Sequence, residues 1–116
     1  MHEMSLAGGV LQLIEQAAAR ERFVRVQRLT LEAGALAGVE VRALRFALEA
    51  LAPGILLEGA EVVIEEPPGQ AWCLRCSEPV TIASRADPCP RCGSYQLQPT
   101  GGTELKVLDL VVLDEE

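Results

Sequence analysis

Apolar residues near the start of the chain recur at the spacing of one helix face: Leu6, Val10, Leu13, Ile14 and Ala17. Ser5 stands just before most of this pattern, where a hydroxyl can cap the first turn of a helix. Gly8 and Gly9 lie inside the pattern, and each costs a helix up to about 1 kcal/mol relative to alanine. We expect a helix here, whose glycines either weaken it or mark the close approach of a partner.

The middle of the chain predicts a strand, a helix and a second strand. Residues 23–33 alternate as a strand with apolar groups on both faces, Leu29, Leu31 and Ala33 on one and Val24 and Val26 on the other. Between the loop glycines Gly34 and Gly38 and the Pro53-Gly54 pair, a second amphipathic helix has apolar residues at Val41, Leu44, Ala47, Leu48 and Leu51. Ala60, Val62 and Ile64 predict the next strand. Such a βαβ unit should place its two strands parallel.

The last strand is expected from Leu105 to Leu113, where apolar residues occupy both registers and call for burial in the first sheet. Pro67-Pro68-Gly69 and the stretch 99–102 then mark the exit from that sheet and the return to it. The predicted fold is α/β, close to α+β, with two helices on a small mixed three-stranded sheet. Residues 1–68 and 99–116 form this discontinuous domain, and residues 69–98 form an inserted lobe.

The inserted lobe holds all four cysteines of the chain, as Cys73-x-x-Cys76 and, after twelve residues, Cys89-Pro90-x-Cys92-Gly93. This is zinc-ribbon spacing, since two tight turns complete a tetrahedral shell of four thiolates that leaves no open position for substrate. Disulfides are disfavoured because the N-terminus does not resemble a signal peptide. A redox role would need only one pair. Apolar residues in the lobe are few, chiefly Val80, Ile82 and Leu97, so metal binding must supply its folding energy.

Composition argues against nucleic acid and membrane as partners. The chain has 116 residues with 49% hydrophobic content, a net charge of −7, one tryptophan, one tyrosine and two phenylalanines. Its arginines are scattered, so neither a basic face nor a set of stacking aromatics is expected. No apolar run is long enough to span a bilayer. A protein or a metal ion is the favoured partner.

The first three residues, Met1, His2 and Glu3, include the single histidine of the chain. A terminal amine, an adjacent deprotonated amide and the imidazole of residue 2 can chelate one ion in a nearly planar, nitrogen-rich geometry, which selects Ni(II) or Cu(II). Glu3 can supply a further donor and offset the helix dipole. The alternatives are an ordinary disordered terminus for His2 and a favourable first-turn carboxylate for Glu3.

The joint pattern resembles the HypA/HybF family of nickel metallochaperones for hydrogenase maturation. The resemblance rests on Met1-His2-Glu3-Met4-Ser5-Leu6, on the segment 31–49 with Gly34, Leu36, Gly38-Val39-Glu40 and Leu44-x-Phe46, on the cysteine pairs, and on Gly102-x-Glu104-Leu105. These motifs extend over the whole chain. An isolated Met-His-Glu opening or an isolated ribbon is weak, but their order and spacing together are specific.

The resemblance implies that His2 and Glu3, with nearby backbone nitrogens, bind Ni²⁺ as cargo, while Cys73, Cys76, Cys89 and Cys92 hold a structural Zn²⁺. It also implies a partner GTPase contacted through the first helix and delivery to the hydrogenase large subunit. In some members urease maturation depends on the same pathway. An acidic residue near position 40 belongs to the nickel site in some relatives, which makes Glu40 a candidate. Its alternative role is that of a solvated residue in the first turn of the second helix.

We therefore interpret the sequence as a cytoplasmic, two-lobed nickel carrier without catalytic activity. The sequence contains no Ser/His/Asp set, phosphate loop or paired-carboxylate motif. Some relatives carry a histidine near the ribbon, and its absence here argues against a link between the lobes through a second imidazole. Two rival hypotheses stand beside this one: a zinc-ribbon adaptor that binds protein or nucleic acid, and a small thiol oxidoreductase with metal-free cysteine pairs.

Overall fold

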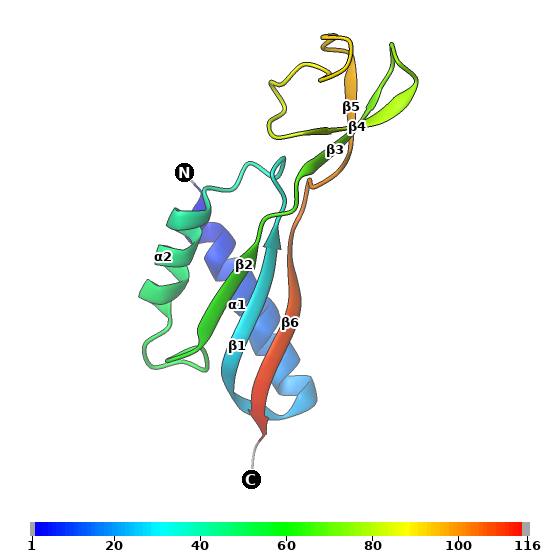
Figure 1. Cartoon of the computed structure of the whole chain (residues 1–116). Coiled ribbons are helices and arrows are strands. Elements are labelled where there is room, and N and C mark those ends of the chain that lie inside the picture. The colour runs from blue at the N-terminus through cyan, green and yellow to red at the C-terminus, as the bar shows by residue number, and fades with distance from the viewer. Residues whose placement is uncertain (1, 115–116) are drawn as a thin grey trace. The chain divides into compact units, whose positions relative to one another are not determined.

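The computed structural model describes residues 2–114. Their elements, in chain order, are α1 (Glu3–Glu21), β1 (Phe23–Ala33), α2 (Val41–Leu51), β2 (Glu61–Glu65), β3 (Gly69–Cys73), β4 (Glu78–Ile82), β5 (Leu97–Gly101) and β6 (Leu105–Asp114) (Figure 1). The described residues form two compact units, one of residues 2–31, 40–64 and 107–114, the other of residues 32–39 and 65–106. No helix within residues 2–114 is long and apolar enough to cross a membrane.

Helix α1 begins at Glu3, ahead of the apolar residues that predict it. His2 is the N-cap, and the backbone N–H of Leu6 donates to the carbonyl of His2 at 2.9 Å. The prediction that Ser5 caps the helix is therefore wrong, since Ser5 lies inside it. The buried residues recur at helical spacing, at Glu3, Ala7, Val10 and Ile14. Leu13, which the pattern also assigns to this face, is 57% exposed.

Helix α2 follows its predicted bounds. Its N-cap is Glu40, whose side chain accepts a hydrogen bond from the backbone N–H of Arg42 at 2.9 Å. This arrangement satisfies one of the donors that every helix leaves open at its start. Leu44, Ala47 and Leu48 form the buried face, and α2 packs against α1. The two helices thus bury apolar stripes that neither could bury alone.

The first unit holds the predicted mixed sheet of three strands. Its order is β2-β1-β6. Figure 1 shows β1 and β2 running in the same direction and β6 running against them, with α1 behind the sheet. The strand–helix–strand arrangement and the return of the last strand to this sheet are confirmed. Val24 is 52% exposed, whereas the residues of β1 that are buried are Phe23, Val26, Leu29, Leu31 and Ala33.

The second unit contains an antiparallel sheet in the order β4-β3-β5. Its apolar cluster consists of Leu36, Ala71, Cys73, Val80, Ile82 and Cys89, with Leu97 packed against it. Val80, Ile82 and Leu97 are thus core residues, as the sequence predicts. Leu36 is an addition from the loop before α2, and the Nε–H of Arg85 donates to its carbonyl oxygen at 2.9 Å.

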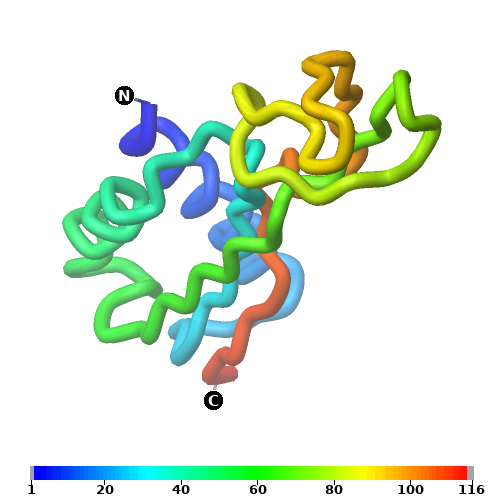
Figure 2. The backbone as a smooth tube through the Cα atoms, turned by 45° about the horizontal axis from the view of Figure 1, so that its top comes forward, coloured from blue at the N-terminus to red at the C-terminus, as the bar shows by residue number. Residues whose placement is uncertain are grey.

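Three segments of the second unit lie side by side where the chain leaves β1, enters β3 and returns from β5 (Figure 2). The backbone N–H groups of Gly34, Ala35 and Leu36 donate at 2.8–3.0 Å to the carbonyls of Glu104, Pro67 and Gly102. A Cβ on Gly34 would lie 2.2 Å from the oxygen of Gly102. Residues 32–39, which the sequence pattern assigns to the discontinuous domain, therefore pack within the second unit.

Candidate metal centres

The four cysteines lie on two similar turns of the second unit. Cys73 ends β3 and Cys76 follows in the next turn, where the backbone N–H of Cys76 points at the sulfur of Cys73 at 3.3 Å. In the other turn, the backbone N–H of Arg91 lies 3.4 Å from the sulfur of Cys89. Such N–H···S contacts stabilise a thiolate, which is the form that binds a metal ion.

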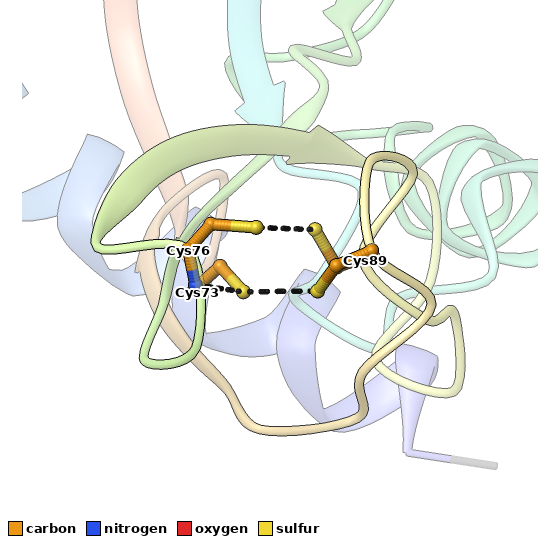
Figure 3. Close-up of side chains that lie close together, drawn as sticks. Cys73, Cys76 and Cys89 are labelled. Atoms are coloured by element: carbon orange, nitrogen blue, oxygen red, sulfur yellow. Dashed lines mark hydrogen bonds between the residues drawn. The ribbon is translucent and has the colours of Figure 1, made fainter.

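The four sulfur atoms lie close enough together to share one metal ion. The Sγ atoms of Cys73 and Cys92 are 3.7 Å apart, those of Cys76 and Cys89 are 3.9 Å apart, and all four lie within 4.8 Å of one another (Figure 3). A disulfide needs a sulfur separation of about 2.05 Å, which excludes these pairs as disulfides. A Zn²⁺ ion with bonds of about 2.3 Å to four sulfurs requires sulfur separations of about 3.8 Å. The observed spacing therefore fits one tetrahedral ion.

The pKa values of these thiols also favour a cation between the four sulfurs. Hydrogen bonding to the sulfur of Cys92 raises the pKa of Cys76 to about 12, and desolvation adds to this shift. The backbone N–H of Cys92, followed by that of Arg91, lowers the pKa of Cys89 to about 7. Four like charges within a few ångströms repel one another, so without a cation the thiols ionise one at a time. A divalent ion at the centre offsets this repulsion and drives out the protons.

The N-terminal candidates lie at the start of α1. The side chain of His2 is exposed, whereas Glu3 is only 7% exposed. A carboxylate oxygen of Glu3 accepts the backbone N–H of Glu40 at 3.0 Å. This hydrogen bond is the largest reason why the pKa of Glu3 falls to about 2. Met1, whose amine is the other predicted donor, lies outside the described residues.

The structure brings Glu3 and Glu40 together, although 37 residues separate them. The backbone N–H of Glu40 makes the contact with Glu3. The exposed side chain of Glu40 caps α2 instead. The family resemblance makes Glu40 a nickel candidate, and the sequence contains no sign of this backbone contact. Among residues 2–114, the four cysteines are the one group of three or more His, Cys, Asp or Glu side chains with metal-binding geometry.

Comparison with known proteins places the chain among nickel-handling proteins. A family model described as "Hydrogenase/urease nickel incorporation, metallochaperone, hypA" matches residues 1–112. The hydrogenase maturation factor HypA of Cupriavidus necator is 67% identical over 98% of this chain and 96% of its own length. The HypA of Polaromonas naphthalenivorans is 64% identical over 99% of this chain and all of its own length.

The fold is also that of a solved protein. The solution structure of the Ni metallochaperone HypA from Helicobacter pylori matches with a TM-score of 0.70 and 23% identity, over 99% of this chain and 100% of that one. At this level of identity the likeness concerns the fold. Together with the family model and the relatives that match over their full lengths, it leads to one conclusion: the chain belongs to the HypA family of nickel metallochaperones for hydrogenase maturation.

Proposed function

We propose that this protein binds Ni(II) at its N-terminus, through His2, adjacent backbone nitrogens and Glu3, and passes it with a partner GTPase to the hydrogenase large subunit. The place of this transfer is the cytoplasm, where thiols stay reduced. The observation that supports the nickel site is the position of His2 and Glu3 at the start of α1. His2 caps a helix of 19 residues, and the carboxylate of Glu3 ties the first turn of that helix to Glu40.

The helix start suits an amide-based site. Glu3 is the first residue of α1, and the first N–H groups of a helix have no partner among the helix's own carbonyls. The amide of Glu3 can lose its proton to a metal ion without breaking the helix. The sequence leaves open whether the amine of Met1 or the amide of Glu3 completes the set with the imidazole. Either set is planar and rich in nitrogen, which favours Ni(II).

Glu3 also compensates for the charge of the cargo. The positive end of the helix dipole opposes a cation at this place, and a carboxylate in the first turn offsets it. Because the pKa of Glu3 is lowered to about 2, this carboxylate stays ionised wherever the nitrogen donors can deprotonate. The donors must lose protons to bind, so nickel affinity rises with pH and falls on acidification.

The nickel proposal is tested by titration of the wild type, His2→Ala and a form with one residue added before Met1. The wild type should form a yellow, diamagnetic planar species, seen by absorption and NMR. His2→Ala should lose it, because the chain has no other histidine to take its place. The extended form removes an amine-based site but spares one built from internal amides. If His2→Ala binds nickel with the spectrum of the wild type, the zinc-ribbon adaptor becomes the better hypothesis.

We propose that the ion held by the four cysteines is a structural Zn²⁺, with one ion per chain, on the basis of the sulfur spacing. Cys73→Ala should release it and unfold the second unit locally, because Cys73 is fully buried in that unit's cluster. The helices of the first unit should persist, as circular dichroism can check. In the native protein the thiols should resist alkylation. Rapid alkylation would favour the thiol oxidoreductase instead.

We propose that the GTPase docks on the exposed side of α1. Gly8 and Gly9 are exposed, and a Cβ on either would meet nothing within 4 Å, so these glycines are not needed for packing inside this chain. Met4 and Leu13 flank them and are 52% and 57% exposed. Gly8→Leu should weaken the complex without changing zinc content, whereas the matched control Gly8→Ala should bind nearly as well. Equal binding of both variants would assign the contact to another surface.

The client is proposed from the names of the relatives. The curated relatives are hydrogenase maturation factors, and the family description names urease beside hydrogenase. We propose the hydrogenase large subunit as the client and urease maturation proteins as further partners. Nickel transfer from the loaded protein to the purified apo form of the hydrogenase large subunit, and to purified urease maturation proteins, tests the choice by nickel analysis of each acceptor.

A further inference from the structure

The antiparallel sheet of the second unit has one buried face and one exposed face. The buried face belongs to the apolar cluster of this unit, through Ala71, Cys73, Val80 and Ile82. On the exposed face, the strand pairing places Trp72 beside Pro79 of β4 and Gln98 of β5. It also places Gln70 beside Thr81. These five residues, which we call the Trp72 face, are exposed and uncharged, although 23% of the residues in the chain are charged.

The composition of the Trp72 face is that of a binding surface. Centres of protein interfaces are poor in charged residues and rich in tryptophan, which often contributes much of the binding energy. Trp72 is the one tryptophan of the chain, lies on the central strand of its sheet and is 39% exposed. The hydroxyl of Thr81 donates to the side-chain oxygen of Gln70 at 3.4 Å, which leaves the NH₂ group of Gln70 as a donor for a ligand.

The surface beside Thr81 is hollowed. The hollow has a volume of about 510 Å³, which lies in the range of ligand pockets, and its lining is mostly apolar and includes three prolines. Among residues 2–114, the one charged residue in this lining is Asp87. One carboxylate oxygen of Asp87 accepts the backbone N–H groups of Ala83 and Ser84 at 3.0 and 3.2 Å. The other oxygen is available to pair with a cationic side chain.

We propose that the Trp72 face binds a proline-rich segment of another protein in the polyproline II conformation, and that an arginine or lysine at one end of the segment pairs with Asp87. Proline has no backbone N–H, so a proline run offers carbonyl acceptors and no donors. The face offers the matching donors, which are the indole N–H of Trp72 and the amides of Gln70 and Gln98. Proline-rich segments dock on aromatic-lined surfaces because their helix is already formed before binding.

Other occupants fit this face less well. Nucleic acid needs lysine or arginine for its phosphates, and the Trp72 face has neither. A second copy does not supply the segment, because no two prolines of this chain stand at the PxxP spacing. The face belongs to the second unit, whereas His2 and Glu3 belong to the first, so binding of the segment does not depend on nickel.

Fluorescence anisotropy of a labelled peptide, mixed with the full zinc-loaded chain, tests the surface. The probe has about ten residues, all proline except for a terminal arginine. It should bind the wild type, and Trp72→Ala should raise the Kd at least about tenfold. Phe46→Ala on α2 is the matched control, because Phe46 is an aromatic residue of the first unit that is 69% exposed, and it should leave the Kd unchanged. Absence of binding to the wild type, or equal effects of the two variants, overturns the proposal.

A second variant guards against a folding defect. Gln98→Glu keeps Trp72 in place and replaces a donor by an acceptor, so it should also weaken binding while zinc content stays that of the wild type. In the wild type, the emission of Trp72 reports directly, because the chain has no other tryptophan. It should shift to shorter wavelength as the probe covers the indole. Binding of the probe without any change in this emission places the peptide elsewhere and refutes the proposal.

The basic end of the segment is tested by exchanging the terminal arginine of the probe for glutamate. The wild type should bind the glutamate probe at least about threefold more weakly. Asp87→Asn keeps an acceptor oxygen for the N–H groups of Ala83 and Ser84 but removes the charge, so it should bind the two probes equally. A flexible glycine–serine peptide with the same arginine should bind weakly. If this peptide, or an oligothymidylate, binds as tightly as the proline probe, the face does not select polyproline and the proposal is wrong.

Discussion

Replacing Gly34 by alanine should destabilise the second unit, because the space for a side chain is already filled. The new Cβ would lie 2.2 Å from the oxygen, 2.3 Å from the carbonyl carbon and 2.7 Å from the Cα of Gly102. Favourable contacts between such atoms need about 3.5 Å. All three neighbours are backbone atoms, so no flexible side chain can move away. The segments that carry Gly34 and Gly102 must therefore separate by about 1 Å.

The cost follows from what that separation breaks. The carbonyl of Gly102 accepts the N–H of Leu36 at 2.8 Å, and the N–H of Gly34 donates to Glu104 at 3.0 Å. Overpacking costs about 1–3 kcal/mol and each lost hydrogen bond about 1 kcal/mol. Alanine returns up to about 1 kcal/mol by restricting the unfolded chain. We expect a net loss of about 3 kcal/mol in the free energy of unfolding, which is a drop of about 10 °C in Tm.

Two other glycines serve as controls in thermal unfolding followed by circular dichroism. Gly38 has φ of 74° but open space around its Cβ position, so Gly38→Ala should cost only the strain of about 1–2 kcal/mol. Gly8 lies in a helix with open space, so Gly8→Ala should stabilise by up to about 1 kcal/mol. If Gly34→Ala is as stable as Gly38→Ala, the close crossing of Gly34 and Gly102 does not exist in solution.

Two further predictions concern contacts that join distant parts of the sequence. Glu3→Gln should make the free energy of unfolding less dependent on pH in the acid range. The pKa of Glu3 is about 2 in the folded state and about 4.3 in the unfolded state. The carboxylate therefore stabilises the fold fully above about pH 5 and loses this contribution as the pH falls towards 2. The Tm difference between wild type and variant should therefore shrink over that range, and a constant difference would contradict it. Leu36→Ala should cost about 2–5 kcal/mol and lower zinc affinity in competition with a chelator, because Leu36 packs in the cluster of Cys73 and Cys89. Unchanged zinc affinity would separate the loop from the metal centre.

Local patterns predicted most of the elements correctly. The helices, the strand–helix–strand order and the return of the last strand follow from apolar periodicity and from turn residues, which act over a few neighbours. The errors in α1 have identifiable causes. Ser5 does not cap the helix because α1 already begins at Glu3, with His2 as its N-cap. Leu13 belongs to the apolar pattern of α1 but is exposed, because the buried residues of this helix are Glu3, Ala7, Val10 and Ile14.

The sequence by itself determined that the four cysteines come together, because two residues between paired cysteines suffice to aim two sulfurs at one point. It also determined the candidates His2 and Glu3, which are adjacent in the chain. The tertiary structure alone decided which distant groups support these residues. The N–H of Glu40 reaches Glu3 across 37 residues, and Leu36 joins the cysteine cluster from a loop before α2. Such contacts depend on how the whole chain folds. Neither the spacing nor the composition of a short segment predicts which distant segment will lie against it.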